Sequence, residues 1–170
     1  MTVAAVYHLP GQGAVFACDS RITMGTTILS DSCDKWLLCG SVTLVVAGAD
    51  GGLTLALARC RDIQQVIRVA DEYSTPRDVD WIALGYDQKS DRIFTLLSCG
   101  QLQPLTRYST IGCGGSYAKG WLDSCALRRD LRSAERVLRD ACQSAIANDA
   151  ACGGLVRTVT HKINGQVRVK

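Results

Sequence analysis

The sequence lacks the signatures that would assign it to a membrane, a secretion route or a nucleotide. No apolar run approaches the length of a membrane span, so we expect no membrane partner. The N-terminus has neither the charged region nor the long apolar run of a signal peptide, and the expected compartment is cytoplasmic. Neither GxGxxG nor GxxxxGK[ST] occurs, which argues against a nucleotide site, and we expect no cofactor.

The chain has nine cysteines, but they do not show the sequence spacings typical of metal-binding motifs. None of them forms a CxxC pair, and none has finger-like spacing with the two histidines, His8 and His161. An odd number of cysteines spread through apolar segments fits reduced thiols that fill the core of a cytosolic protein. The sequence therefore leaves the question of a metal ligand set open.

The charge pattern gives no support for a nucleic-acid partner. The net charge is only +3, and the arginines are scattered except for a modest cluster. At its spacing, much of that cluster lies on the outer face of a helix, which favours a solvated surface. Its members are Arg128, Arg129, Arg132, Arg136 and Arg139.

The length of 170 residues, with 47% apolar and 21% charged residues, is typical of one globular domain, which we place at 1–170. No repeat, linker or low-complexity tract interrupts it. Patterning predicts helices at 53–73, 116–128 and 133–148. Predicted strands are 2–7, 14–18, 26–29, 36–39, 42–47, 81–86, 92–98, 155–162 and 166–169, with a type I′ turn at Asn164-Gly165.

The order of these elements indicates the fold class. Strands lie at both ends of the chain, and helices are segregated between them. This order favours an α+β fold in which two sheets pack face to face with helices outside, a four-layer αββα sandwich. Another α+β arrangement is the alternative.

The stretch from Ala14 to Lys35 combines an acid and a base at strand ends. A buried strand ends at Asp19, and Lys35 begins the next apolar run. If these strands are neighbours, the two side chains meet at one end of a sheet, where a partly desolvated lysine becomes chemically useful. An ordinary strand-end ion pair is the simpler interpretation.

Thr2 offers a nucleophile for this pair to act on. Methionine before a small residue is normally removed, which would free the α-amine of Thr2 as a base beside its own hydroxyl. The reference pKa of such an amine is about 7.7–8.0, and a nearby Lys35 ammonium would lower it. The N–H of Gly48, in one of three glycine-rich turns, could donate to an oxyanion. The alternatives are that Thr2 only starts a strand and that the glycines form plain turns.

Several motifs resemble one family in their order along nearly the whole chain. They are TVAAV at 2–6, ACDSRITMG at 17–25, DK at 34–35, VAGAD at 46–50, IGCGGSYAKGWLD at 111–123 and NDAACGG at 148–154. Together they resemble the N-terminal-nucleophile (Ntn) hydrolases of the proteasome β-subunit and HslV type. The resemblance implies the αββα sandwich, threonine-type endopeptidase activity and a closed ring.

The resemblance also implies roles for individual residues. Thr2 matches the nucleophile, Lys35 the catalytic lysine and Gly48 the oxyanion donor. Asp19 and Arg21 match the aspartate and arginine of the family's Asp-Ser-Arg motif. Asp149 matches an acid that helps to order the N-terminus in that family. The residues that fall where the family lines its primary specificity pocket imply a small apolar pocket; they are Ile22, Cys33, Leu37 and Val46.

Three positions depart from the family pattern. Cys113 and Cys152 stand where the family usually has serines that hold the threonine amine and a water, and Asn148 replaces an arginine. A thiol is a larger and weaker hydrogen-bonding group than a hydroxyl. The span from Thr2 to Asp19 is also one residue longer, which the turn at 10–13 can absorb.

These observations predict a threonine peptidase that cleaves peptides and unfolded proteins by acyl transfer to Thr2 after Met1 removal. The expected assembly is a homo-oligomer of stacked hexameric or heptameric rings, with an ATP-dependent unfoldase as partner for folded substrates. Alternatives are a weakly active or inactive ring scaffold, a small-molecule Ntn amidohydrolase, or a binding domain.

Overall fold

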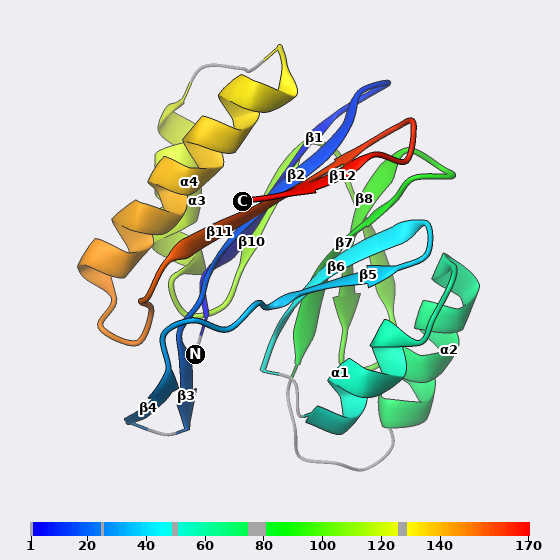
Figure 1. Cartoon of the computed structure of the whole chain (residues 1–170), viewed down its shortest axis with the longest axis horizontal. Helices are drawn as coiled ribbons and strands as arrows, with labels where there is room; N and C mark the ends of the chain where they lie inside the picture. Colours follow the sequence, from blue (N-terminus) through cyan, green and yellow to red (C-terminus); the bar gives the residue numbers. More distant parts are fainter. Residues whose placement is uncertain (1, 25, 49–50, 75–80, 126–128) are drawn as a thin grey trace.

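Two five-stranded antiparallel sheets and a separate two-stranded hairpin form the framework of the chain. The structure is a computed structural model that describes residues 2–24, 26–48, 51–74, 81–125 and 129–170. The described residues form four helices and three antiparallel sheets, which confirms a mixed α/β fold (Figure 1).

The first sheet contains both ends of the chain, in the strand order β10-β1-β2-β11-β12. The hairpin β1–β2 pairs Ala4 with Cys18, and β11 pairs with the other edge of β2, placing Val156 opposite Asp19. The bounds are β1 Ala4–Leu9, β2 Gly13–Asp19, β10 Tyr108–Ile111, β11 Val156–Lys162 and β12 Val167–Val169.

The second sheet is a meander in the order β5-β6-β7-β8-β9. Its bounds are β5 Trp36–Cys39, β6 Val42–Ala47, β7 Ile82–Asp87, β8 Arg92–Leu97 and β9 Leu102–Leu105. The hairpin consists of β3 Ile22–Met24 and β4 Thr27–Ser30. The helices are α1 Gly51–Ala58, α2 Ile63–Ser74, α3 Gly115–Ser124 and α4 Leu131–Asn148.

Strand β1 is buried along its whole length because its two faces contact different layers. Ala5 and Tyr7 belong to a core cluster with residues of α3 and α4, whereas Ala4 and Val6 belong to a cluster shared with the second sheet. A third cluster joins the second sheet to α1 and α2. The two helix pairs lie on opposite sides of the molecule (Figure 1).

Helix α4 shows how local sequence fixes an element that supports the first sheet. The carboxylate of Asp130 caps its N-terminus by accepting the backbone N–H groups of Arg132 and Ser133 at 3.0 and 2.9 Å. Its inner face carries Ala134, Leu138 and Ala141, all buried against β1 and β2. Small residues at this spacing let the helix lie close to the sheet.

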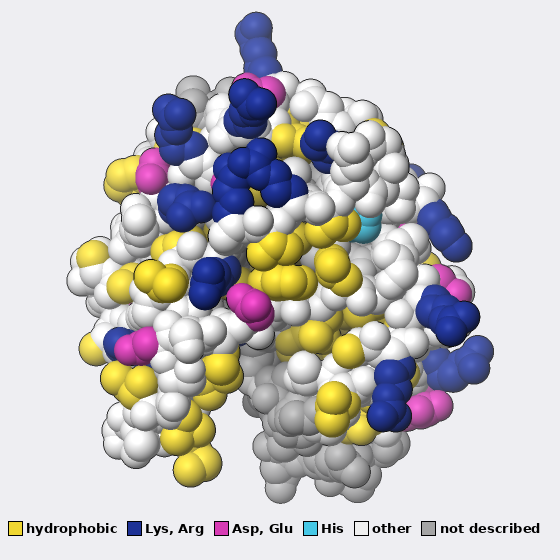
Figure 2. Space-filling model, viewed as in Figure 1, with side chains coloured by type: hydrophobic (Ala, Val, Ile, Leu, Met, Phe, Trp, Pro, Cys, Tyr) yellow, Lys and Arg dark blue, Asp and Glu magenta, His cyan; other side chains and the backbone are white. Residues whose placement is uncertain are grey.

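The predicted solvated arginine cluster is confirmed in part. Arg132 and Arg136 are exposed on α4, but Arg139 is half-buried and lies 3.7 Å from the buried Glu135. Basic side chains gather over this part of the molecule (Figure 2), and Lys170 also pairs with Glu135 at 2.8 Å. Arg128 lies outside the described residues.

Several predicted elements need correction. The helix expected at 53–73 is two helices, broken between Ala58 and Ile63. Strands β3, β9 and β10 were not predicted as strands. The expected type I′ turn is also wrong: a tight turn is present, but Gly165 has a positive φ of 85° and Asn164 does not, whereas type I′ needs both.

The nine cysteines are all described, and all are free thiols. Five are buried, which confirms that most of them fill the core. Burial raises the pKa of Cys18 and of Cys39 to about 12, so both stay protonated. In the part of the chain that the structure describes, no helix has the length and apolar character needed to cross a membrane.

Replacing Leu138 by alanine should test the packing of α4 on the first sheet. Leu138 is fully buried, so Leu138→Ala should lower the free energy of unfolding by about 2–5 kcal/mol. The matched control is Leu55→Ala, since Leu55 is 64% exposed on α1 and should change stability by less than about 0.5 kcal/mol. Urea unfolding followed by circular dichroism measures both, and equal losses would contradict the packing described.

Candidate active site

The site begins where β1 starts and β2 ends. The backbone N–H of Val3 donates to Asp19 Oδ1 at 3.0 Å, and the N–H of Asp19 donates to the Val3 carbonyl at 3.1 Å. These bonds place Thr2, which is 6% exposed, beside the carboxylate of Asp19. The hairpin register therefore brings two residues seventeen positions apart to one end of the sheet.

Lys35 bridges these two residues. Its Nζ lies 2.6 Å from Asp19 Oδ1 and donates to Thr2 Oγ1 at 3.0 Å. The backbone carbonyl of Lys35 accepts the N–H of Val46, so the lysine is anchored beside the second sheet while its side chain reaches the first. The predicted meeting of Asp19 and Lys35 is therefore present.

The carboxylate of Asp19 is fully buried and is satisfied by donors from three segments. Besides Lys35 and Val3, the N–H of Gly153 donates to its second oxygen, Oδ2, at 3.1 Å. A buried charge is tolerated only when it is paired and its remaining lone pairs are used. Gly153 thus belongs to the site.

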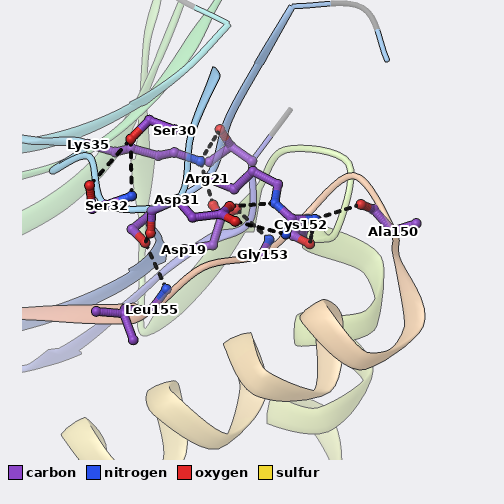
Figure 3. Close-up of polar contacts among 12 residues, drawn as sticks. Asp19, Arg21, Ser30, Asp31, Ser32, Lys35, Ala150, Cys152, Gly153 and Leu155 are labelled. Atoms are coloured by element: carbon purple, nitrogen blue, oxygen red, sulfur yellow. Dashed lines mark hydrogen bonds and ion pairs between the residues drawn. The ribbon is translucent and has the colours of Figure 1, made fainter. Parts of the chain in front are cut away.

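Arg21 ties the start of the β3–β4 hairpin to the loop that follows α4 (Figure 3). Its guanidinium donates to Asp31 at 2.7 Å and to the carbonyls of Ala150 and Cys152 at 3.1 and 3.3 Å. The hydrogen bond from Arg21 lowers the pKa of Asp31. A Cβ on Gly153 would lie 2.2 Å from Arg21 Cζ, so any larger residue there would displace the guanidinium from its present contacts.

Ser20 links the same two segments, and its role was not predicted from the sequence. Its hydroxyl donates to the carbonyl of Asp31 and accepts the N–H of Leu155 at 2.8 Å. Its position between Asp19 and Arg21 was the one available signal. Asp31 was also missed, because nothing in its own neighbourhood indicates that Arg21 is its partner.

On the other side of Thr2, two thiols and a carboxylate lie together. Cys113 Sγ donates to the Thr2 carbonyl at 3.5 Å and lies 3.5 Å from Cys152 Sγ, which contacts Asp149 Oδ2 at 3.6 Å. Burial raises the pKa of the Cys152 thiol above its usual range, whereas a hydrogen bond from the Ala151 N–H lowers the pKa of Asp149. The network expected from Cys113, Cys152 and Asp149 is thus assembled.

A cavity of about 320 Å³ opens beside Thr2 and Lys35. Three of the residues predicted to form a substrate pocket line it, namely Ile22, Leu37 and Val46. The fourth, Cys33, is half-buried and is not among the described residues of the lining; its N–H donates to the Ser20 carbonyl. The described residues of the lining are Thr2, Arg21, Ile22, Thr23, Asp34, Lys35, Leu37, Val46, Gly48 and Thr54.

Gly48 lies in the wall of this cavity with a positive φ of 79°. It follows β6 directly, so its backbone is presented at the end of a buried strand. Thr23, Asp34 and Thr54 are polar lining residues that the sequence did not indicate. Met1, whose removal is predicted, lies outside the described residues.

Comparison with protein-family models and with curated proteins found no match to this chain. The side chains themselves define the chemistry that is available. A threonine hydroxyl contacts an ammonium that is held by a buried carboxylate, and the threonine and the lysine lie at the wall of a cavity. Such a constellation can activate a hydroxyl as a nucleophile.

Replacing Asp19 by asparagine should destabilise the protein as well as the site. Asp19→Asn leaves the Lys35 ammonium without its charged partner in a buried position, which should cost about 3–5 kcal/mol of unfolding free energy. Asp31→Asn is the matched control, since Asp31 pairs with Arg21 on the surface and its loss should cost far less. Urea unfolding measures both; an Asp19 variant no less stable than the control would contradict the assigned role.

Proposed function

We propose that the protein is an N-terminal threonine endopeptidase related to the proteasome β-subunits and HslV. One observation carries the proposal: Lys35 Nζ contacts both Thr2 Oγ1 at 3.0 Å and Asp19 Oδ1 at 2.6 Å, beside a cavity large enough for a side chain. A strand-end ion pair alone would not need the hydroxyl of the second residue as its third member. The motifs of the sequence support the same family.

The proposed reaction begins after Met1 is removed. Thr2 Oγ1 attacks the scissile carbonyl carbon, and its proton passes to the free α-amine of the same residue. The Lys35 ammonium stabilises the developing charge on Oγ1, and the N–H of Gly48 donates to the carbonyl oxygen as it becomes an oxyanion. The α-ammonium then protonates the leaving amine, and water hydrolyses the resulting ester to regenerate Thr2.

The cavity lining supports a preference for apolar side chains of modest size. Ile22, Leu37 and Val46 supply apolar walls, while Thr23 and Asp34 place polar groups in the same lining. Apolar walls with a few polar groups are typical of sites that bind a side chain and orient the backbone beside it. The substrate class is therefore proposed to be peptides and unfolded chains.

The packing and the surface support the proposed architecture. One core cluster joins α3 and α4 to the first sheet, a second joins the two sheets, and a third joins the second sheet to α1 and α2. This succession of clusters supports the four-layer αββα order. The β3–β4 hairpin protrudes from the body (Figure 1) and exposes Met24, Ile28 and Leu29 by 50% or more. An exposed apolar strip of this kind supports assembly with further copies. The proposed assembly is a set of stacked rings in the cytoplasm, with an ATP-dependent unfoldase as partner for folded substrates.

Removing the Thr2 hydroxyl should abolish peptide hydrolysis. Thr2→Ala removes the nucleophile, and the rate with fluorogenic peptides should fall by at least about a thousandfold, the usual scale for losing a nucleophile. Thr2→Ser, which keeps a hydroxyl and an amine, should retain measurable activity. Intact mass must show that each protein has lost Met1, and retained activity in Thr2→Ala would contradict the proposal.

The assembly can be measured independently of activity. Native mass spectrometry and light scattering of the wild type and of Thr2→Ala should both give two stacked hexameric or heptameric rings, because the Thr2 side chain is buried within its own chain. A monomer or dimer would contradict the ring and favour the small-molecule amidohydrolase. Rings without hydrolysis would favour the scaffold alternative.

A further inference from the structure

We infer that Cys113, Cys152 and Asp149 form a binding site for a thiophilic divalent cation, with Zn²⁺ as the chemical type. The three ligand atoms lie within 4.8 Å of one another, and they come from the loop after β10, the loop after α4 and the C-terminal end of α4. The site is separate from the Thr2–Lys35–Asp19 contacts but lies against the carbonyl of Thr2.

The distances fit tetrahedral coordination. With Zn–S near 2.3 Å and Zn–O near 2.1 Å, a tetrahedral site places two sulfurs about 3.8 Å apart and a sulfur and an oxygen about 3.6 Å apart. The observed separations are 3.5 Å between the sulfurs and 3.6 Å between Cys152 Sγ and Asp149 Oδ2. An opening of about 0.3 Å would bring the sulfurs to the tetrahedral separation. The third pair, Cys113 Sγ and the Asp149 carboxylate, lies within 4.8 Å.

The surroundings meet the other requirements of a metal site. Cys152 is buried and therefore fixed, whereas Cys113 is exposed and provides an entry path. The second oxygen of Asp149 accepts the Ala151 N–H at 2.9 Å, which orients the carboxylate from outside the ligand set. Two sulfurs and one carboxylate favour Zn²⁺ over Mg²⁺ or Ca²⁺, which prefer oxygen ligands.

Three protein ligands leave a fourth position for a water molecule. The Thr2 carbonyl lies 3.5 Å from Cys113 Sγ, outside the ligand set. Without metal, the Cys113 thiol donates to that carbonyl; with metal, the sulfur is a thiolate and the donor is lost. The metal would then loosen the chain beside the nucleophile. This last step rests on the proposed function and predicts a several-fold slower peptide hydrolysis with Zn²⁺.

Titration of the reduced protein with Co²⁺ tests the site without any activity measurement. Thiolate-to-cobalt charge-transfer absorption should saturate at one Co²⁺ per chain and disappear when Zn²⁺ is added. Cys113→Ser and Cys152→Ser should each weaken Co²⁺ binding at least about tenfold. Mutating a residue that only hydrogen-bonds to a metal ligand already lowers metal affinity by about that factor. Cys99→Ser is the matched control, because Cys99 is an exposed thiol outside the cluster, and it should bind as the wild type does.

A labelling experiment on the wild type keeps the test decisive if a serine variant does not fold. Zn²⁺ should protect Cys113, but not Cys99, from alkylation as read by mass spectrometry of peptides. No cobalt band in the wild type, an unchanged band in both serine variants, or equal alkylation of Cys113 with and without Zn²⁺ would overturn the inference.

The two proposals fail separately. Thr2→Ala should keep the full cobalt band, because the Thr2 side chain is not a ligand. A band in protein that hydrolyses no peptide in the absence of metal would contradict the peptidase and leave the metal site standing. Hydrolysis without any band would contradict the metal site alone.

Discussion

The buried ion pair between Asp19 and Lys35 is the interaction on which the site depends. Their side chains are 0% and 7% exposed, so each charge would be costly if the other were absent. The carboxylate of Asp19 also accepts N–H groups from Val3 and Gly153. One side chain therefore joins the start of β1, the end of β2, the segment before β5 and the loop after α4, and the site exists only when all four are in place.

The pair also couples the two large sheets. Asp19 ends a strand of the first sheet, whereas Lys35 leads into the second and is hydrogen-bonded to β6. The distance of 3.0 Å between Lys35 Nζ and Thr2 Oγ1 is therefore set by how the sheets pack. That packing involves Phe16 and Tyr86 in the intersheet cluster, so a core substitution there would change the position of the lysine relative to the hydroxyl.

The features that the sequence predicted well are those encoded by local pattern. Alternation and β-branched runs located most strands, and Asp19 and Lys35 were paired because one ends a buried run and the other begins the next. Breaks were harder to predict: apolar residues keep a helical period across 59–62, although the chain turns there. Contacts between loops carry no local signal at all. The bond from Leu155 to Ser20 spans 135 positions, and Asp31 is recognisable as a partner of Arg21 only in three dimensions.

The same reasoning explains why two cysteines without any metal-binding spacing lie together. Cys113 and Cys152 are 39 positions apart, and each sits in a loop beside the first residues of β1. Gly112 lets the first of these loops approach, since a Cβ there would lie 2.0 Å from the Thr2 carbonyl oxygen. The thiol of Cys113 can hydrogen-bond to that carbonyl, or it can release its proton to solvent and bind a metal as a thiolate, but it cannot do both. In the proposals made above, positioning of the proposed nucleophile and occupancy of the proposed cation site are therefore opposed at a single sulfur atom, a coupling that a serine hydroxyl at the same place would make much weaker.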